Sequence, residues 1–198
     1  MSRFVYIIGN GHGGLINGVP QTAGNRSVDF GDGILYEGVT NREIAAIVLA
    51  ELCELNIPAI NLVPELEDIS LAERVRRVNR FKNAIYFSLH CDGFHLEKAN
   101  GWSAYTYYGQ SDSDKIANIL YKKAEEAKLK LRKDLWDGDP DKEAGFYVLK
   151  NTNCPAVLVE NLFMTNKKNN EFLRSEDGKK VLAKVIVDTI VEIEENGL

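Results

Sequence analysis

Two histidines stand where a sheet would present them to solvent. His12 follows the apolar run 4–8 within a cluster of glycines, and His90 comes directly after the apolar run 84–89. Open α/β sheets bind their ligands at the carboxyl ends of the strands. A catalytic zinc site needs three nitrogen or oxygen ligands from the protein and one open position. A single histidine is more often a packed or surface residue, but two at equivalent positions favour a metal site.

Two carboxylates could complete this chemistry. Glu37 precedes a predicted helix and is the best candidate for the third ligand, although a solvated glutamate stabilised by the helix dipole explains it equally well. Glu160 follows the apolar run 155–159, so its carboxylate is expected at the end of a buried strand. Near an activated water it could act as general base and then as general acid. The alternative is a structural glutamate that pairs with an arginine or a helix cap.

The segments that position these residues alternate between strand and helix patterns. Strands are predicted over residues 4–8, 57–63, 84–89, 104–108, 145–149 and 156–159. Capping boxes at Thr40 to Glu43 and Ser70 to Glu73 predict two helix starts; two further helices are expected around residues 116–131 and 181–193. The pattern predicts one α/β domain over residues 1–198, with a twisted, mainly parallel sheet flanked by helices on both faces.

Residues 13–36 form the longest segment without a regular pattern. Glycine, asparagine and proline recur through it, which predicts a loop. Loops of this length inside a domain are commonly functional, so we expect a mobile flap that covers the cleft and helps to select the substrate.

The composition excludes several classes of protein. The 198 residues suit one globular domain, and 44% of them are hydrophobic while 27% are charged. A net charge of −5 argues against a nucleic-acid binder. Three cysteines without C-x-x-C spacing predict neither a disulfide framework nor a thiolate zinc site. No apolar run approaches the roughly 20 residues that span a bilayer, and no signal peptide is recognisable. We therefore expect synthesis in the cytoplasm, no membrane insertion and a monomer.

The candidate residues lie in four motifs that occur in order along nearly the whole chain. The motifs are GHGG at 11–14, Glu37, SLH at 88–90, and PAVLVE at 155–160 with Phe163 and Asn166 after it. Together they resemble the zinc-dependent N-acetylmuramoyl-L-alanine amidases of the Amidase_3 family. Asn41, Asp68, Ser70, Leu71, Arg74, Asn79 and Gly101 are also similar to that family.

The resemblance implies an assignment for each candidate residue. His12, Glu37 and His90 would bind Zn²⁺, and Glu160 would be catalytic. The substrate would be peptidoglycan, cut at the amide between N-acetylmuramic acid and L-alanine. The long loop and the absence of a recognisable export signal resemble phage endolysins. Such an enzyme would need a membrane-permeabilising partner of the holin type before it could act on the cell wall.

The chain departs from the family pattern around these residues. Gly9 and Asn10 stand where the family usually has Asp-Pro, Gly38 where Lys is common, Asp92 where Asn is usual, and Asn161 where Gly is usual. These departures leave the ligands intact but change their neighbours, so they bear on details of substrate recognition.

Three other functions are compatible with parts of the sequence. A zinc site could serve a peptidase acting on peptidoglycan stem peptides, and the fold could persist in a non-catalytic peptidoglycan-binding module. Gly9, Gly11 and Gly14 match the dinucleotide-binding spacing, but Asn17 to Pro20 follows where that site needs a helix. A zinc content near one per chain would support the amidase, and absence of zinc would support the dinucleotide-binding or binding-module alternatives.

A run of alternating aspartates resembles part of a calcium loop. Asp137, Asp139 and Asp141 have the expected spacing, but Lys142 stands where the loop needs Gly and Val148 where it needs Glu. The sequence therefore favours a polar turn.

Two further features have structural explanations. Cys91 follows His90, but neighbouring residues of a strand point to opposite faces, so we expect Cys91 to pack in the interior. Four aromatic residues in and just before the fourth predicted strand could stack on sugars, but we expect two of them to lie in the core. They are Trp102, Tyr105, Tyr107 and Tyr108.

Overall fold

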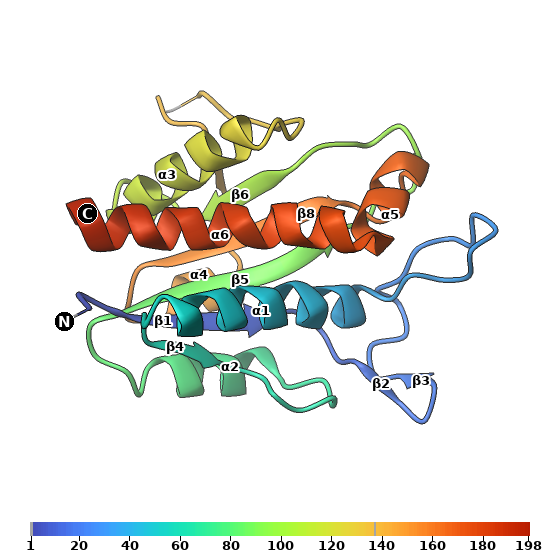
Figure 1. The fold of residues 1–198 in the computed structure, drawn as a ribbon, viewed down its shortest axis with the longest axis horizontal. Coiled ribbons are helices and arrows are strands. Elements are labelled where there is room, and N and C mark those ends of the chain that lie inside the picture. Colours follow the sequence, from blue (N-terminus) through green and yellow to red (C-terminus); the bar gives the residue numbers. More distant parts are fainter. Residues whose placement is uncertain (1, 137) are drawn as a thin grey trace.

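A six-stranded sheet forms the centre of the protein (Figure 1). The computed structural model describes residues 2–136 and 138–198. In sheet order the strands are β4 (Ala59–Asn61), β1 (Val5–Asn10), β5 (Ala84–Asp92), β8 (Ala156–Phe163), β6 (Ser103–Thr106) and β7 (Lys142–Glu143). The first four are parallel, β6 is antiparallel to β8, and β7 is parallel to β6. The prediction of a mainly parallel sheet is confirmed.

Helices cover both faces of this sheet, as the sequence predicts. One face carries α1 (Glu37–Glu54), α3 (Asp112–Glu126) and α6 (Glu176–Asn196), and α6 lies between the other two (Figure 1). The opposite face carries α2 (Leu71–Val78) and α4 (Tyr147–Asn151). A further helix, α5 (Lys167–Arg174), follows β8 and was not predicted; Asn166 caps it by accepting a hydrogen bond from the backbone N–H of Asn169 at 3.1 Å.

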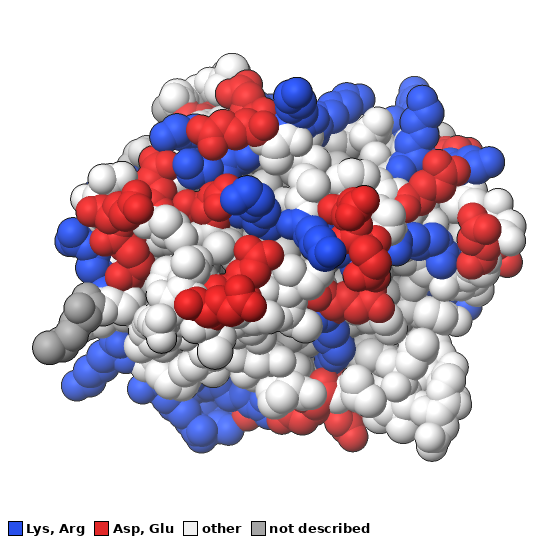
Figure 2. Space-filling view, viewed as in Figure 1, with Lys and Arg blue, Asp and Glu red and all other residues white. Residues whose placement is uncertain are grey.

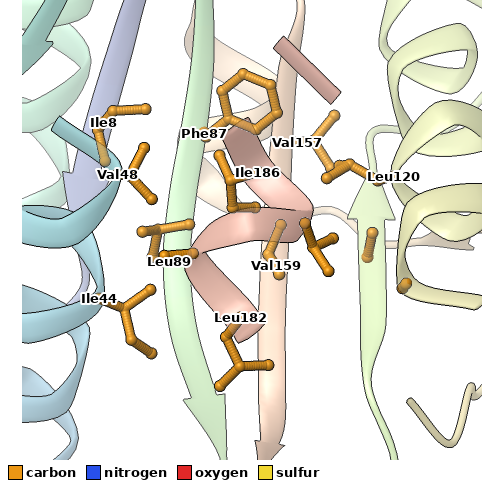
Figure 3. Packing of buried hydrophobic residues seen from close by; sticks show 14 of the residues in the cluster. Ile8, Ile44, Val48, Phe87, Leu89, Leu120, Val157, Val159, Leu182 and Ile186 are labelled. Atoms are coloured by element: carbon orange, nitrogen blue, oxygen red, sulfur yellow. The ribbon is translucent and has the colours of Figure 1, made fainter. Parts of the chain in front are cut away.

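The larger core lies between the sheet and α1, α3 and α6. Leu182 and Ile186 of α6 lie over Leu89 of β5 and Val159 of β8, and α1 and α3 close the two sides (Figure 3). Because these strands are covered on both faces, their apolar runs are almost continuous instead of alternating. Full burial of each such aliphatic side chain contributes about 1.5–3 kcal/mol. The core therefore holds rigid the strands that carry His90 and Glu160.

The predicted start of the first helix is wrong. The helix α1 begins at Glu37, and Thr40 lies inside its first turn, where its hydroxyl donates to the carbonyl of Tyr36. Glu43 does not complete a capping box, since it pairs with Lys179 of α6 at 3.1 Å. By contrast, the predicted helix start at Ser70 is confirmed, because its hydroxyl accepts from the backbone N–H of Glu73. The side chain of Glu73 pairs with Arg76 and Arg77 instead of completing the capping box.

Two further predictions need correction. Residues 145–149 do not form a strand, because Val148 and Leu149 belong to the helix α4. They pack into the smaller core, which lies between the sheet and the helices α2 and α4. A short apolar run suits a strand and a buried helix equally well. Residues 13–36 contain a small hairpin of β2 (Leu15–Ile16) and β3 (Val19–Pro20).

The surface mixes both signs of charge. Acidic and basic side chains are interspersed over the face that carries α1 and α6 (Figure 2). Some of them join helices, as where Lys123 of α3 pairs with Glu192 of α6 at 2.8 Å. None of the helices in the described part of the chain is long and apolar enough to cross a bilayer.

Candidate active site

His12 lies in a turn just after β1 and has a left-handed backbone conformation, with φ of 63°. For a residue with a side chain this conformation costs roughly 1–2 kcal/mol. The neighbouring Gly11 allows close contact with His90, since a Cβ at this position would stand 2.2 Å from Cε1 of the His90 ring. The two imidazole rings meet edge to face with centroids 5.1 Å apart. The GHGG motif thus serves to bring two histidines together.

Glu37 lies between the two histidines, at the first position of α1. One carboxylate oxygen lies 3.0 Å from Nδ1 of His90, and the other lies 3.2 Å from Nε2 of His12. The first oxygen also accepts from the backbone N–H of Cys91 and from the amide of Asn41. Burial raises the pKa of Glu37, but the hydrogen bonds with His12 and His90 outweigh it and hold the pKa well below its usual range. Glu37 is therefore an ionised carboxylate in the interior.

These three side chains fit a metal ion. Their ligand atoms all lie within 4.8 Å of one another. Metal–ligand bonds of about 2.0–2.2 Å in a tetrahedral zinc site place neighbouring ligand atoms about 3.3–3.6 Å apart. The distances from Glu37 to His12 and His90, 3.2 and 3.0 Å, are only slightly shorter. Two imidazole nitrogens and one carboxylate oxygen are a ligand set that catalytic zinc sites use.

Glu160 faces the same cleft from the neighbouring strand. It is the register partner of His90 in the parallel pair β5 and β8, next to an irregularity in the pairing. Both residues therefore lie within their strands, near the carboxyl ends, and not beyond them as the sequence suggested. The Oε2 atom of Glu160 is buried without a hydrogen-bond partner among the described residues. Burial, reinforced by the negative charges of Glu37 and Asp92, raises the pKa of Glu160 well above its usual value.

The sequence left open a structural role for Glu160, in which its carboxylate would pair with an arginine or a helix cap. No ion pair of Glu160 occurs in the part of the chain that the structure describes. Arg132 instead pairs with Asp92 at 3.0 Å and lies over the ring of Phe163. A buried carboxylate that lacks a partner and faces a cleft is suited to exchange protons with a ligand.

Two cavities meet at these residues. A polar cavity of about 480 Å³ contains Glu37 together with Asn25 and Asp92. A more apolar cavity of about 570 Å³ extends over Leu71 and Tyr147. His12, His90 and Glu160 line both cavities. The candidate site therefore lies at the junction of two recesses, with room for a substrate that extends in two directions.

Asn25 belongs to the site although the sequence analysis did not identify it. Its amide nitrogen donates to Glu37 Oε2 at 2.8 Å and lies 2.9 Å from His12 Nε2. The backbone carbonyl of Asn25 also accepts from the backbone N–H of Glu37. Only its place in the long loop between two candidate ligands could have suggested it. The loop is anchored to the site here, and its function as a mobile flap stays a prediction.

The departures from the family pattern have local explanations. A Cβ at Gly38 would stand 2.0 Å from the carbonyl oxygen of Gly13, so no larger residue fits there without movement. Asn10 donates to the carbonyl of Val63 at 3.2 Å, and Asn161 accepts from the indole N–H of Trp102 at 3.2 Å. Asn10 and Asn161 thus each make one side-chain hydrogen bond, while Oδ1 of Asn10 and Nδ2 of Asn161 are buried without a partner among the described residues.

The glycine motif, Cys91 and the aromatic residues behave as expected. No helix begins at Gly14, which excludes the dinucleotide-binding arrangement. Cys91 is buried, and so is Trp102, while Tyr105 is half-buried against the smaller core. The other two aromatic residues, Tyr107 and Tyr108, are exposed. Of the aspartates with calcium-loop spacing, Asp137 lies outside the described residues.

Comparisons with known proteins show the family to which the chain belongs. Residues 7–192 match the family described as N-acetylmuramoyl-L-alanine amidase. The chain is 28% identical over 171 residues to the N-acetylmuramoyl-L-alanine amidase LytC of Bacillus subtilis (strain 168), which covers 82% of this chain and 33% of that protein. It is also 28% identical over 130 residues to the endolysin of Bacillus phage SPP1, covering 62% of this chain and 45% of the endolysin. The chain thus matches less than half the length of either relative.

The fold is shared with solved structures. The catalytic domain of CwlV, an N-acetylmuramoyl-L-alanine amidase from Bacillus (Paenibacillus) polymyxa var. colistinus, superimposes with a TM-score of 0.80 and 25% sequence identity. That match covers 97% of this chain and 98% of the other. The catalytic domain of the CD27L endolysin superimposes with a TM-score of 0.73 at 20% identity and shows the same fold.

Proposed function

Because the chain belongs to the N-acetylmuramoyl-L-alanine amidase family, we propose that it hydrolyses the amide between N-acetylmuramic acid and L-alanine in peptidoglycan. One observation carries the proposal. The buried carboxylate of Glu37 bridges His12 and His90, and the same cavity contains Glu160, whose Oε2 has no hydrogen-bond partner among the described residues. The same cleft thus holds a metal-binding group and an acid–base group, which amide hydrolysis requires together.

We propose that His12, Glu37 and His90 hold Zn²⁺. When bound, zinc polarises the scissile carbonyl and lowers the pKa of water toward about 7. Asn41 and the backbone N–H of Cys91 orient the Glu37 carboxylate from behind. Removal of such contacts to ligand residues commonly lowers metal affinity or activity by about 10–100-fold.

Glu160 moves the protons of the reaction in this mechanism. Its carboxylate takes a proton from the attacking water as the new C–O bond forms. It then gives this proton to the leaving nitrogen as the C–N bond breaks, because an amine anion is too basic to leave. The raised pKa of Glu160 suits the second step, and the positive charge of a bound cation favours the ionised form needed for the first.

The two joined cavities suit a branched substrate. The scissile amide of a muropeptide joins a sugar to a peptide, so groups extend from it on both sides. The apolar cavity offers Leu71, Tyr147 and Leu158 for contact, whereas the other offers mainly polar side chains. His12, His90 and Glu160 line both cavities, so the reacting bond would lie where the cavities meet. Glu37, the third proposed metal ligand, lines only the polar cavity.

Analysis of the products tests the proposed bond. Digestion of purified peptidoglycan should release stem peptides with new L-alanine amino termini, while glycan strands gain no reducing ends. Mass spectrometry of the soluble products would identify a stem-peptide peptidase by other new amino termini, and a glycosidase by released disaccharides. Wild-type protein that binds the wall without releasing any product would instead be a binding module.

We also propose a role as an endolysin that reaches the wall through a permeabilised membrane. The similarity to the phage SPP1 endolysin supports this role. Cells that express the protein should stay intact until a pore-forming protein or chloroform opens the membrane, and should then lyse. Lysis without permeabilisation would contradict the role, and a Glu160→Gln variant controls for effects of expression itself.

A further inference from the structure

Three aspartates gather at the opposite edge of the sheet from β4, away from the catalytic cleft. Asp114 lies in the first turn of α3, while Asp139 and Asp141 precede the edge strand β7. One carboxylate oxygen from each lies within 4.8 Å of the others. All three residues are buried, with Asp141 only 1% exposed. None of them lines either cavity of the candidate active site.

Two carboxylate oxygens of this cluster have no partner. Oδ1 of Asp139 and Oδ1 of Asp141 are buried without a hydrogen bond among the described residues. The hydroxyl of Thr106 lies 2.6 Å from Asp141 and 3.2 Å from Asp114, although it carries a single proton. Within the part of the chain that the structure describes, no Lys, Arg or His forms an ion pair with any of the three aspartates.

Buried carboxylates without a counter-charge are costly. Ionised groups in protein interiors are paired or bind metals, and otherwise they take up a proton. All the possible metal ligands in this cluster are oxygen atoms, from three carboxylates and one hydroxyl. Ca²⁺ binds oxygen ligands, whereas Zn²⁺ commonly binds nitrogen or sulfur as well. We propose that Asp114, Asp139 and Asp141 form a structural Ca²⁺ site, with the Thr106 hydroxyl as an additional oxygen.

The sequence spacing alone did not indicate this site. Asp137, Asp139 and Asp141 were compared with a calcium loop that takes its ligands from one continuous segment. In the structure, Asp114 comes from a different element and joins Asp139 and Asp141 across β6 and β7. The missing Gly and Glu of a calcium loop therefore do not count against this site.

A bound ion would connect three parts of the protein. It would join the first turn of α3, the end of β6 at Thr106 and the segment that leads into β7. This segment also carries the exposed side chains of Leu135 and Trp136. Occupancy of the site should therefore stabilise this edge of the sheet.

A proton shared by Asp139 and Asp141 is the competing explanation. Burial, together with hydrogen bonding to Asp139, raises the pKa of Asp141 to about 7. A protonated pair would need no cation, and the protein would then show no response to calcium. The two explanations therefore differ in a direct binding measurement.

The experiment measures calcium binding to the zinc-loaded protein. Equilibrium dialysis at pH 8 should show about one Ca²⁺ per chain, with a dissociation constant at or below about 1 mM. Calcium at about 100 times the dissociation constant should raise the melting temperature by about 5–10 °C. Asp141→Asn and Asp139→Asn should each weaken binding at least tenfold. Asp112→Asn, an exposed charge change on the same helix turn, should leave it unchanged.

The possible results each decide the question. Wild-type protein that binds no calcium at several millimolar would overturn the site in favour of the shared proton, whether or not the variants fold. Calcium binding that survives in both Asp139→Asn and Asp141→Asn would overturn the assignment of ligands. Because His90→Ala disrupts only the catalytic site, calcium binding that persists in this variant separates the inference from the proposed amidase function.

Discussion

The replacement of Glu160 by Gln separates acid–base chemistry from metal binding. Gln has nearly the shape of Glu, but it cannot accept the proton of water or return it to a leaving amine. Since Glu160 is not among the three clustered ligand residues, the metal site should persist. We therefore expect a folded, zinc-loaded protein that has lost its activity.

The sizes of both effects follow from the structure. Loss of a general acid–base group lowers rates by about 10²–10⁴-fold, which corresponds to about 2.7–5.4 kcal/mol of transition-state stabilisation. The effect on stability should be small, because Oε2 of Glu160 has no partner to lose among the described residues. The substitution also removes a charge that lies near Glu37 and Asp92. We expect the melting temperature to change by less than about 4 °C.

Three measurements on one preparation check this reasoning. Elemental analysis should find about one zinc per chain, calorimetry a near-native melting temperature, and mass spectrometry no new L-alanine amino termini. Glu171→Gln, an exposed glutamate on α5, is the matched control and should behave as wild type. Activity of Glu160→Gln within tenfold of wild type would refute the acid–base role. Loss of zinc would show that Glu160 is a ligand.

Three other substitutions test the geometry around the metal. His90→Ala should lose zinc and activity together, because two remaining ligands hold the ion poorly, and a variant with wild-type zinc content would exclude His90 as a ligand. Gly38→Ala should lower the melting temperature by roughly 5–10 °C, since its Cβ would stand 2.0 Å from the carbonyl of Gly13, whereas Gly24→Ala has open space and should be tolerated. Asn25→Ala should leave the fold intact but weaken zinc affinity by about 10–100-fold, as measured by competition with a chelator, and an unchanged affinity would show that its contacts with Glu37 do not support the site.

The alternation of strands and helices could be predicted because each element has a strong local pattern. The apolar runs of β1, β5 and β8 reflect burial on both faces, and the stripe of α6 reflects burial on one. A short element carries too few residues for its pattern to distinguish a strand from a helix. The run 145–149 was assigned to a strand and forms a helix, because a few apolar residues suit either structure until the surrounding core selects one.

The first helix shows how tertiary contacts overrule a local signal. A capping box at Thr40 is a sound local pattern, yet the helix begins at Glu37. There the carboxylate is held by His12, His90 and the backbone of Cys91. Contacts from remote segments thus decided where the helix starts.

The residue types and their order along the chain identified His12, His90 and Glu160, because each follows or ends an apolar run that a parallel sheet brings to one edge. The sequence left Glu37 equally explained by a solvated helix terminus. Only the tertiary structure placed its carboxylate within 3.2 Å of both histidines. Likewise, only the folded chain brings Asn25 to Glu37 and Asp114 to Asp141. These residues are far apart in sequence, and a local pattern does not determine which distant segments come into contact.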